Sequence, residues 1–210
     1  MTMTYTSLTG GKTVPGSIMS WVNYAKLDIE QVLEEAQAVI FQRLRVREMR
    51  NLDSSIPVAP GDYQKPLPAR FLEARRLRST DNLDYALVSE TALLDARVYD
   101  ASGTLVAGTP AAFAVFDEML QFDQKFSAGT TLLLLCFKSP ALLSAQNPAN
   151  FLTGRFPHLV RTACLAQAAD FMKNDSEYAK HMQRLYDQID AGNAESDLGM
   201  SAATYSTTMV

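Results

Sequence analysis

The side chains best suited to catalysis or metal binding in this sequence are His158, His181, Cys136 and Cys164. Neither histidine has a neighbour at a spacing typical of metal ligands. Cys164 follows His158 by six positions, which does not place both on one face of a helix. Both cysteines lie in apolar runs without a CxxC pair, which favours buried free thiols over a disulfide. No nucleophile-elbow, zinc-protease, P-loop or dinucleotide motif occurs, so we expect no catalytic residue, metal or cofactor.

The other chemically distinctive group is a set of guanidinium side chains within eight positions. It comprises Arg43, Arg45, Arg47 and Arg50. Three interpretations are open. The arginines can form a solvated helix end that complements the helix dipole, contact acidic groups of a partner protein, or bind DNA directly. A net charge of -4 and a pI near 5.2 weigh against a protein that grips nucleic acid by bulk charge.

The elements that must position these groups are helices near both ends of the chain. Apolar spacing predicts a helix from Asp28, with Gln31 completing an approximate capping box, that ends at the arginines. A shorter helix is predicted over residues 17–25. Near the other end, Pro157 is placed to start a helix with a small-residue face. A further helix is expected from Asp175 or Ser176 to Gly192.

Between these helices, prolines punctuate the chain and the apolar period changes. The expected elements are a helical turn or two around residues 71–77, a short helix over residues 89–97 capped by Ser89, strands over residues 113–116, 119–122 and 130–138, and a loop over residues 141–156. Asp117 and Glu118 form a plausible two-residue hairpin turn between the first two strands.

This order of elements predicts an α+β fold, a helical bundle with an inserted small antiparallel β-subdomain and extended termini. The domain boundaries that we expect are an extended arm over residues 1–14, a main domain over residues 15–194, and an extended tail over residues 195–210. Within the main domain, helices occupy residues 17–50 and 157–191, and the β-rich insertion covers about residues 52–140. The apolar runs have only strand length, which predicts no membrane span, and residues 1–11 lack the features of a signal peptide. We therefore expect a protein made in the cytoplasm.

Four segments, in order, resemble motifs of the head–tail adaptor proteins of tailed bacteriophages, of the podophage and siphophage type. They are AVIFQRLRVREM at 38–49, LPARFLE at 67–73, GTPAAFAV at 108–115 followed by TLLLLCF at 131–137 with Pro140, Leu142, Leu143, Ser144, Asn147, Phe151 and Leu152, and FPHL at 156–159 running into the alanine-rich helix. Arg70 stands where the family commonly has an acidic residue. The resemblance covers roughly residues 17–190.

The resemblance implies a structural role in the virion, at the connector between head and tail. Adaptors of this kind form a ring, usually of twelve subunits, that lies under the portal protein, carries a tail or tail-nozzle protein, and continues the channel through which DNA passes without sequence-specific binding. On this basis we expect Arg43, Arg45, Arg47 and Arg50 to contact the portal or a neighbouring subunit. We expect the same of the C-terminal tail, with the candidate contacts Ser201, Tyr205, Met209 and Val210.

Two alternatives stay open at this stage. One is another connector component, such as a stopper or tail-completion protein. The other is a small cytoplasmic enzyme whose site no motif reveals.

Overall fold

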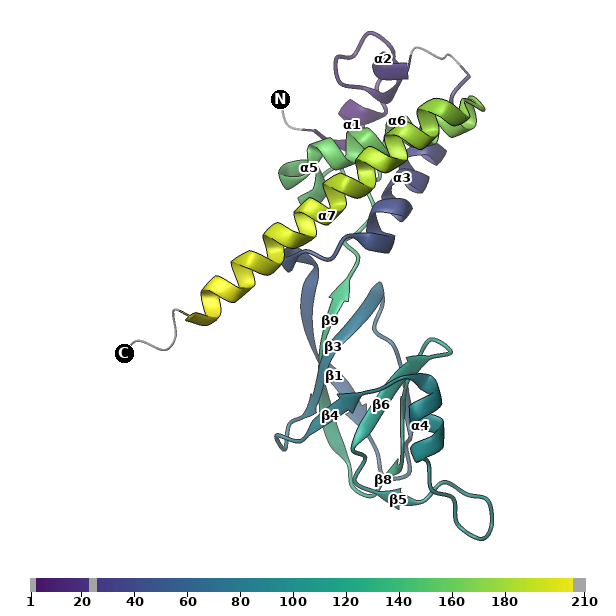
Figure 1. Cartoon of the computed structure of the whole chain (residues 1–210), viewed down its shortest axis with the longest axis vertical. Coiled ribbons are helices and arrows are strands. Elements are labelled where there is room, and N and C mark those ends of the chain that lie inside the picture. Colours follow the sequence, from purple (N-terminus) through teal and green to yellow (C-terminus); the bar gives the residue numbers. More distant parts are fainter. Residues whose placement is uncertain (1–2, 23–25, 206–210) are drawn as a thin grey trace. The chain divides into compact units, whose positions relative to one another are not determined.

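The computed structural model describes residues 3–22 and 26–205, and it describes side chains as far as Asp197 with the exception of Ser54 and Ser55. The chain divides into two compact units. Unit 1 joins Met1–Glu48 to Pro140–Val210, and unit 2 is the continuous segment Met49–Ser139. Figure 1 shows that the first is built from helices and the second mainly from strands.

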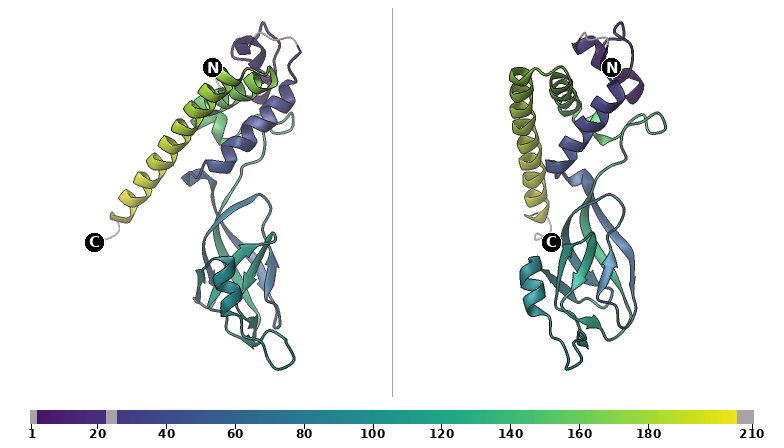
Figure 2. Two further views of the ribbon diagram at one scale, coloured as in Figure 1. Left: turned by 45° about the vertical axis from the view of Figure 1, so that its right-hand side comes forward. Right: turned by 90° about the vertical axis from the view of Figure 1, so that its right-hand side faces the viewer.

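Unit 1 packs its helices around α6. In the described residues its helices are α1 (Tyr5–Leu8), α2 (Ile18–Val22), α3 (Ile29–Arg43), α5 (Phe151–Arg155), α6 (Pro157–Phe171) and α7 (Asp175–Tyr205). The α6 helix contacts α2, α3, α5 and α7, and it lies side by side with α7 in a helical hairpin (Figure 2). The α3 helix is followed by a 3-10 helix, η1 (Arg47–Met49).

Local sequence accounts for how these helices begin and pack. The Asp28 side chain accepts a hydrogen bond from the Gln31 backbone N–H at 3.1 Å, and Pro157 occupies the first turn of α6, as predicted. Ala163 and Ala166 are fully buried, and Ala169 nearly so. Because alanine lets helix backbones approach closely, these residues explain how α6 packs between its neighbours within the chain.

Unit 2 is a seven-stranded sheet beside a two-stranded one, as far as the described residues show. Its elements are β1 (Arg50–Val58), β2 (Gln64–Pro66), β3 (Phe71–Ser79), β4 (Asp84–Leu87), α4 (Glu90–Ala96), β5 (Ala107–Gly108), β6 (Ala112–Phe116), β7 (Met119–Phe122), β8 (Lys125–Phe126) and β9 (Thr130–Lys138). The strand order of the large sheet is β1-β9-β3-β4-β6-β7-β2, and β5 pairs with β8. The pair β4–β6 is parallel, and the other pairs of the large sheet are antiparallel.

The predicted fold class is therefore wrong. The chain is a mixed α/β protein with a large curled sheet (Figure 1), not a helical bundle with a small antiparallel insertion. The prediction placed no strand at β1 or β2, where it had only extended segments punctuated by prolines. Pro57 lies in β1 and Pro66 in β2, and these are the two outermost strands of the sheet. Proline is tolerated at such edges because no further strand needs its missing N–H.

The expected helical turn around residues 71–77 is a strand instead, β3. Ala74 and Leu77 are both buried although they are three residues apart. The pairing with β9 shifts between Ala74 and Arg76, and this β-bulge inserts one residue into the strand. An inserted residue reverses which face the following side chains occupy, so a strand mimics the three-residue spacing of a helix.

The core of unit 2 gathers around three aromatic rings. Phe122 lies edge-to-face with Phe126 at 4.8 Å between ring centroids and with Tyr85 at 5.9 Å. Tyr85 and Phe126 are 6.1 Å apart. Phe122 is fully buried, and Leu134 and Cys136 of the interior strand β9 belong to the same cluster. The predictions of β9 and of the Asp117–Glu118 turn are confirmed; both turn residues have positive φ, as a type I′ hairpin requires.

The expectations for the termini and for one loop are corrected. Residues 5–8 of the supposed extended arm form α1, which Thr4 caps and whose Leu8 is fully buried. Residues 151–155 of the supposed loop form α5, capped by Asn150. The tail expected to be extended from residue 195 is helical as far as Tyr205.

Gly192 does not end α7, contrary to the prediction. A Cβ atom built at this position would lie 3.6 Å from the Phe156 ring and 3.9 Å from Leu44. Glycine here lies where α7 passes close to other parts of unit 1, so its small size, not its backbone freedom, explains its place. The start of α7 also differs in detail, because Asn174 accepts the hydrogen bond from Glu177 N–H that was expected for Asp175 or Ser176.

Candidate functional site

The α3 helix carries opposite charges at its two ends. Glu30, Glu34 and Glu35 are exposed in its N-terminal half, and Arg43 is exposed at its last position. Both signs agree with the helix dipole. The Arg43 guanidinium lies 4.1 Å from the centre of the Tyr186 ring on α7, which holds the cation in a fixed place at the surface.

The chain that leaves α3, residues 43–47, is here called the arginine segment. Side chains of α7 hold its backbone. Asn193 donates to the Arg43 carbonyl at 3.0 Å and accepts from the Arg45 N–H at 2.7 Å. Ser196, which is buried, accepts from the Arg47 N–H at 2.8 Å. The α7 helix therefore replaces the hydrogen bonds that a neighbouring strand would otherwise make to this extended segment.

The four predicted arginines do not form one cluster. Arg45 folds back and donates to the Phe41 and Leu44 carbonyls at 2.9 and 2.8 Å, so it satisfies the C-terminal end of α3. Arg50 lies in β1 and belongs to unit 2. Arg43 and Arg47 are the members of the set that unit 1 presents at its surface, and the side chain of Arg47 is 65% exposed.

Arg155, the last residue of α5, connects the end of the arginine segment to α7. Its guanidinium pairs with Glu48 of η1 and lies 3.5 Å from Glu195 of α7. The arginine segment thus has one polar attachment at each end, Asn193 near its start and the ion pair of Arg155 just after it. Asn193 and Ser196 hold the backbone of Arg43 and Arg47, and the Arg47 guanidinium lies 3.8 Å from Glu48.

A groove of about 250 Å³ lies at the opposite end of α3. Its lining includes Tyr5, Glu30 and Glu34 together with Leu142, which is 45% exposed. We call this surface the acidic groove. Tyr5 donates to Glu30 at 2.8 Å, and this hydrogen bond raises the pKa of the Tyr5 hydroxyl. The carboxylates are visible in the sequence, but the groove is not, because α1 and the segment after β9 complete it.

The wall of the acidic groove is fixed by a buried glutamine. Gln37 accepts from the Leu143 N–H at 2.7 Å and donates to the Leu33 carbonyl at 3.2 Å. It thereby joins the segment that carries Leu142 to the α3 helix. A surface built on buried hydrogen bonds keeps its shape before a partner arrives, which reduces the entropic cost of binding.

Two of the four predicted C-terminal contact residues lie in the part of the chain that the structure describes. Ser201 and Tyr205 lie on α7, whereas Met209 and Val210 fall outside the described residues.

A model of one protein family, the SU10 adaptor protein, matches residues 3–207 of the chain. The chain belongs to the SU10 adaptor family. The predicted resemblance to phage head–tail adaptors is thereby confirmed, and a search of curated proteins found no match.

Membership in the SU10 adaptor family implies a structural protein of the phage particle rather than an enzyme. It also implies, in general terms, interaction with portal and tail proteins. No helix in residues 3–22 or 26–205 has the length and apolar character needed to cross a membrane.

The cysteines and histidines of this SU10 adaptor lie in packed surroundings, in contact with apolar or aromatic side chains or buried from solvent. Cys136 and Cys164 are free and buried, as predicted, and burial raises the pKa of the Cys164 thiol to about 12. His158 lies against the Phe156 ring, and burial lowers the pKa of His181. Within the part of the chain that the structure describes, no three His, Cys, Asp or Glu residues converge as metal ligands would.

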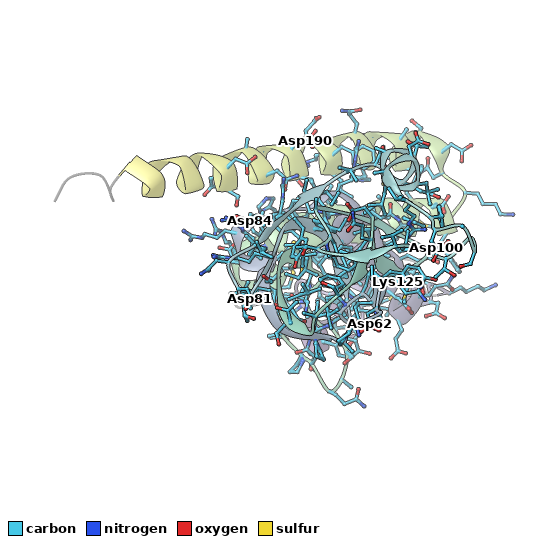
Figure 3. The ribbon with its side chains drawn as sticks, turned by 90° about the horizontal axis from the view of Figure 1, so that it is seen from below. Asp62, Asp81, Asp84, Asp100, Lys125 and Asp190 are labelled. Atoms are coloured by element: carbon cyan, nitrogen blue, oxygen red, sulfur yellow. The ribbon has the colours of Figure 1, made fainter. Side chains whose placement is uncertain are left out.

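Three acidic side chains of unit 2, Asp62, Asp84 and Asp100, have a lowered pKa because each has a local hydrogen-bond partner; Figure 3 labels the three. Asp62 bonds to Lys65, Asp84 to Arg76, and Asp100 to Ser102. These bonds favour the charged form of each carboxylate. They hold turns and strand ends in place, so their perturbed pKa values have a structural explanation.

Proposed function

We propose that the protein assembles into a ring under the portal of a tailed phage, extends the DNA channel and carries the tail or tail nozzle. The family match over residues 3–207 is the observation that carries this proposal. We further propose twelve subunits, the number implied by the resemblance to head–tail adaptors.

A ring needs two different contact surfaces on every subunit, so that each copy binds the next head to tail. Unit 1 offers two surfaces of opposite charge, the arginine segment and the acidic groove. The net charge of -4 on each copy also suits a channel, because carboxylates repel DNA phosphates that pass within a Debye length.

The test is to mix the purified chain with the portal protein of its own phage and to measure the mass of the product by sedimentation and electron microscopy. The expected result is a portal bearing one added ring, with one copy of this chain for each portal subunit. A portal that stays bare over the whole range of salt concentrations would overturn the proposal. Addition of a single copy instead would favour a different connector component, such as a stopper.

The C-terminal end of α7 is the part that we propose to dock on the portal. Ser196 is buried and holds the Arg47 N–H, so a truncation that tests docking must keep it. A chain that ends at Asp197 should unfold at the same urea concentration as the full chain. It should nevertheless bind the portal at least about tenfold more weakly, since the lost residues include Ser201, Tyr205, Met209 and Val210. Equal portal affinity of the two chains would show that docking lies elsewhere.

A further inference from the structure

Two surfaces of unit 1 carry charged groups for which the described part of the chain supplies no ion-pair partner. Among the residues that the structure describes, Glu34 makes no ion pair or hydrogen bond. The Arg43 guanidinium rests on the Tyr186 ring and, within the same residues, has no carboxylate beside it. Glu34 lines the acidic groove, and Arg43 lies at the start of the arginine segment.

These two groups cannot neutralise each other within one molecule. Both belong to α3, and the nine-residue offset from Glu34 to Arg43 corresponds to about 14 Å along the helix axis at 1.5 Å per residue. An ion pair needs about 4 Å between the charged atoms. The helix therefore keeps its acidic and basic surfaces apart, so each surface is available to a group of opposite charge on another molecule.

We infer that Arg43 of one copy binds in the acidic groove of the next copy, so that α3 supplies both halves of the subunit interface. This inference rests on the proposed ring and names the contact that would close it. The Arg43 guanidinium suits the acidic groove chemically. It binds carboxylates well, and its flat, weakly hydrated face can pack against the apolar side chain of Leu142.

The interface has the polarity that a ring requires. A surface that binds only its complement, and not itself, joins copies head to tail and leaves one of each surface free until the ring closes. Both surfaces are held in place beforehand, the groove by Gln37 and the arginine segment by Asn193. Charge reversal on either side should therefore act on assembly and leave the fold of the subunit intact.

The experiment uses full-length chains in the portal assembly described above. Arg43→Glu and Glu34→Arg each place like charges opposite one another at every contact, so each variant alone should form at least about tenfold fewer rings than the wild type. An equal mixture of the two variants should restore rings, because every contact in an alternating ring then pairs Arg with Glu. The double variant, Arg43→Glu with Glu34→Arg in one chain, should also assemble.

The matched control is Glu35→Arg, which reverses an exposed carboxylate one position along α3 that is not part of the groove lining. It should assemble as the wild type does. Fluorescence of Trp21, the single tryptophan of the chain, checks that each variant is folded. If the wild type forms rings and the single variants form them equally well, the inference is overturned and the proposed function stands. Failure of Arg43→Glu alone, with normal assembly of Glu34→Arg, would assign Arg43 to the portal and also overturn it. Absence of rings with the wild type would overturn both.

Discussion

Replacing Phe122 with alanine should lower the free energy of unfolding of unit 2 by about 3–5 kcal/mol. The Phe122 side chain is fully buried and lies edge-to-face with both Tyr85 and Phe126. Truncation removes its buried apolar surface, leaves a cavity, and breaks two aromatic contacts. The measurement is urea unfolding followed by near-UV circular dichroism, which reports the packing of the aromatic rings.

The control for this variant is Phe171→Ala. Phe171 is 44% exposed at the end of α6, so its truncation should cost far less than that of Phe122. Trp21 belongs to unit 1, and its fluorescence follows that unit separately. A Phe122→Ala chain whose near-UV signal unfolds at the urea concentration of the wild type would contradict the core that we describe.

Replacing Asn193 with alanine should lower the free energy of unfolding of unit 1 by about 2 kcal/mol. The substitution removes two hydrogen bonds to the arginine segment and leaves the Arg45 N–H without its acceptor in a partly buried place. An unsatisfied backbone donor carries the larger part of this cost. Urea unfolding followed by Trp21 fluorescence measures the change.

Glu195→Ala serves as the comparison, since Glu195 lies two residues further along α7 and its side chain is 72% exposed. Its 3.5 Å contact with Arg155 is a surface pair, so its removal should cost at most about 0.5 kcal/mol. Because Asn193 also holds the arginine segment in place, the Asn193→Ala chain should assemble less well than its loss of stability alone explains. Identical unfolding of the Asn193 and Glu195 variants would contradict the role that we give to the α7 side chains.

Elements whose signals are local could be predicted from the sequence. Ser89 caps α4, Pro157 begins α6, and the apolar run over Thr130–Lys138 is the strand β9, which has a neighbour on each side. Each of these depends on a few adjacent residues: a side-chain oxygen, a fixed φ angle, or an unbroken apolar stretch. The family resemblance was also correct. It depended on four short motifs in a fixed order along the chain, and recognising them does not require the fold to be predicted correctly.

The errors arose where distant residues decide the structure. The bulge in β3 depends on its pairing with β9, so the spacing of Ala74 and Leu77 pointed to a helix. The place of Gly192 depends on Phe156 and Leu44, which no local pattern reveals. The acidic groove likewise needs α1, α3 and the segment around Leu142 together. The sequence predicted one group of four arginines with a common role, but the hydrogen bonds from Arg45 to carbonyls of α3 show that this one stabilises the end of the helix.

The two ends of unit 2 lie in neighbouring strands. The chain enters the unit through β1 and leaves it through β9, and Arg50 near the start pairs directly with Phe137 near the end. A segment whose ends lie next to each other is organised as an inserted domain, because the rest of the chain has to span only a short distance if the segment is removed or replaced. A different sheet inserted at the same two positions should therefore leave the helices that carry the two charged surfaces unchanged.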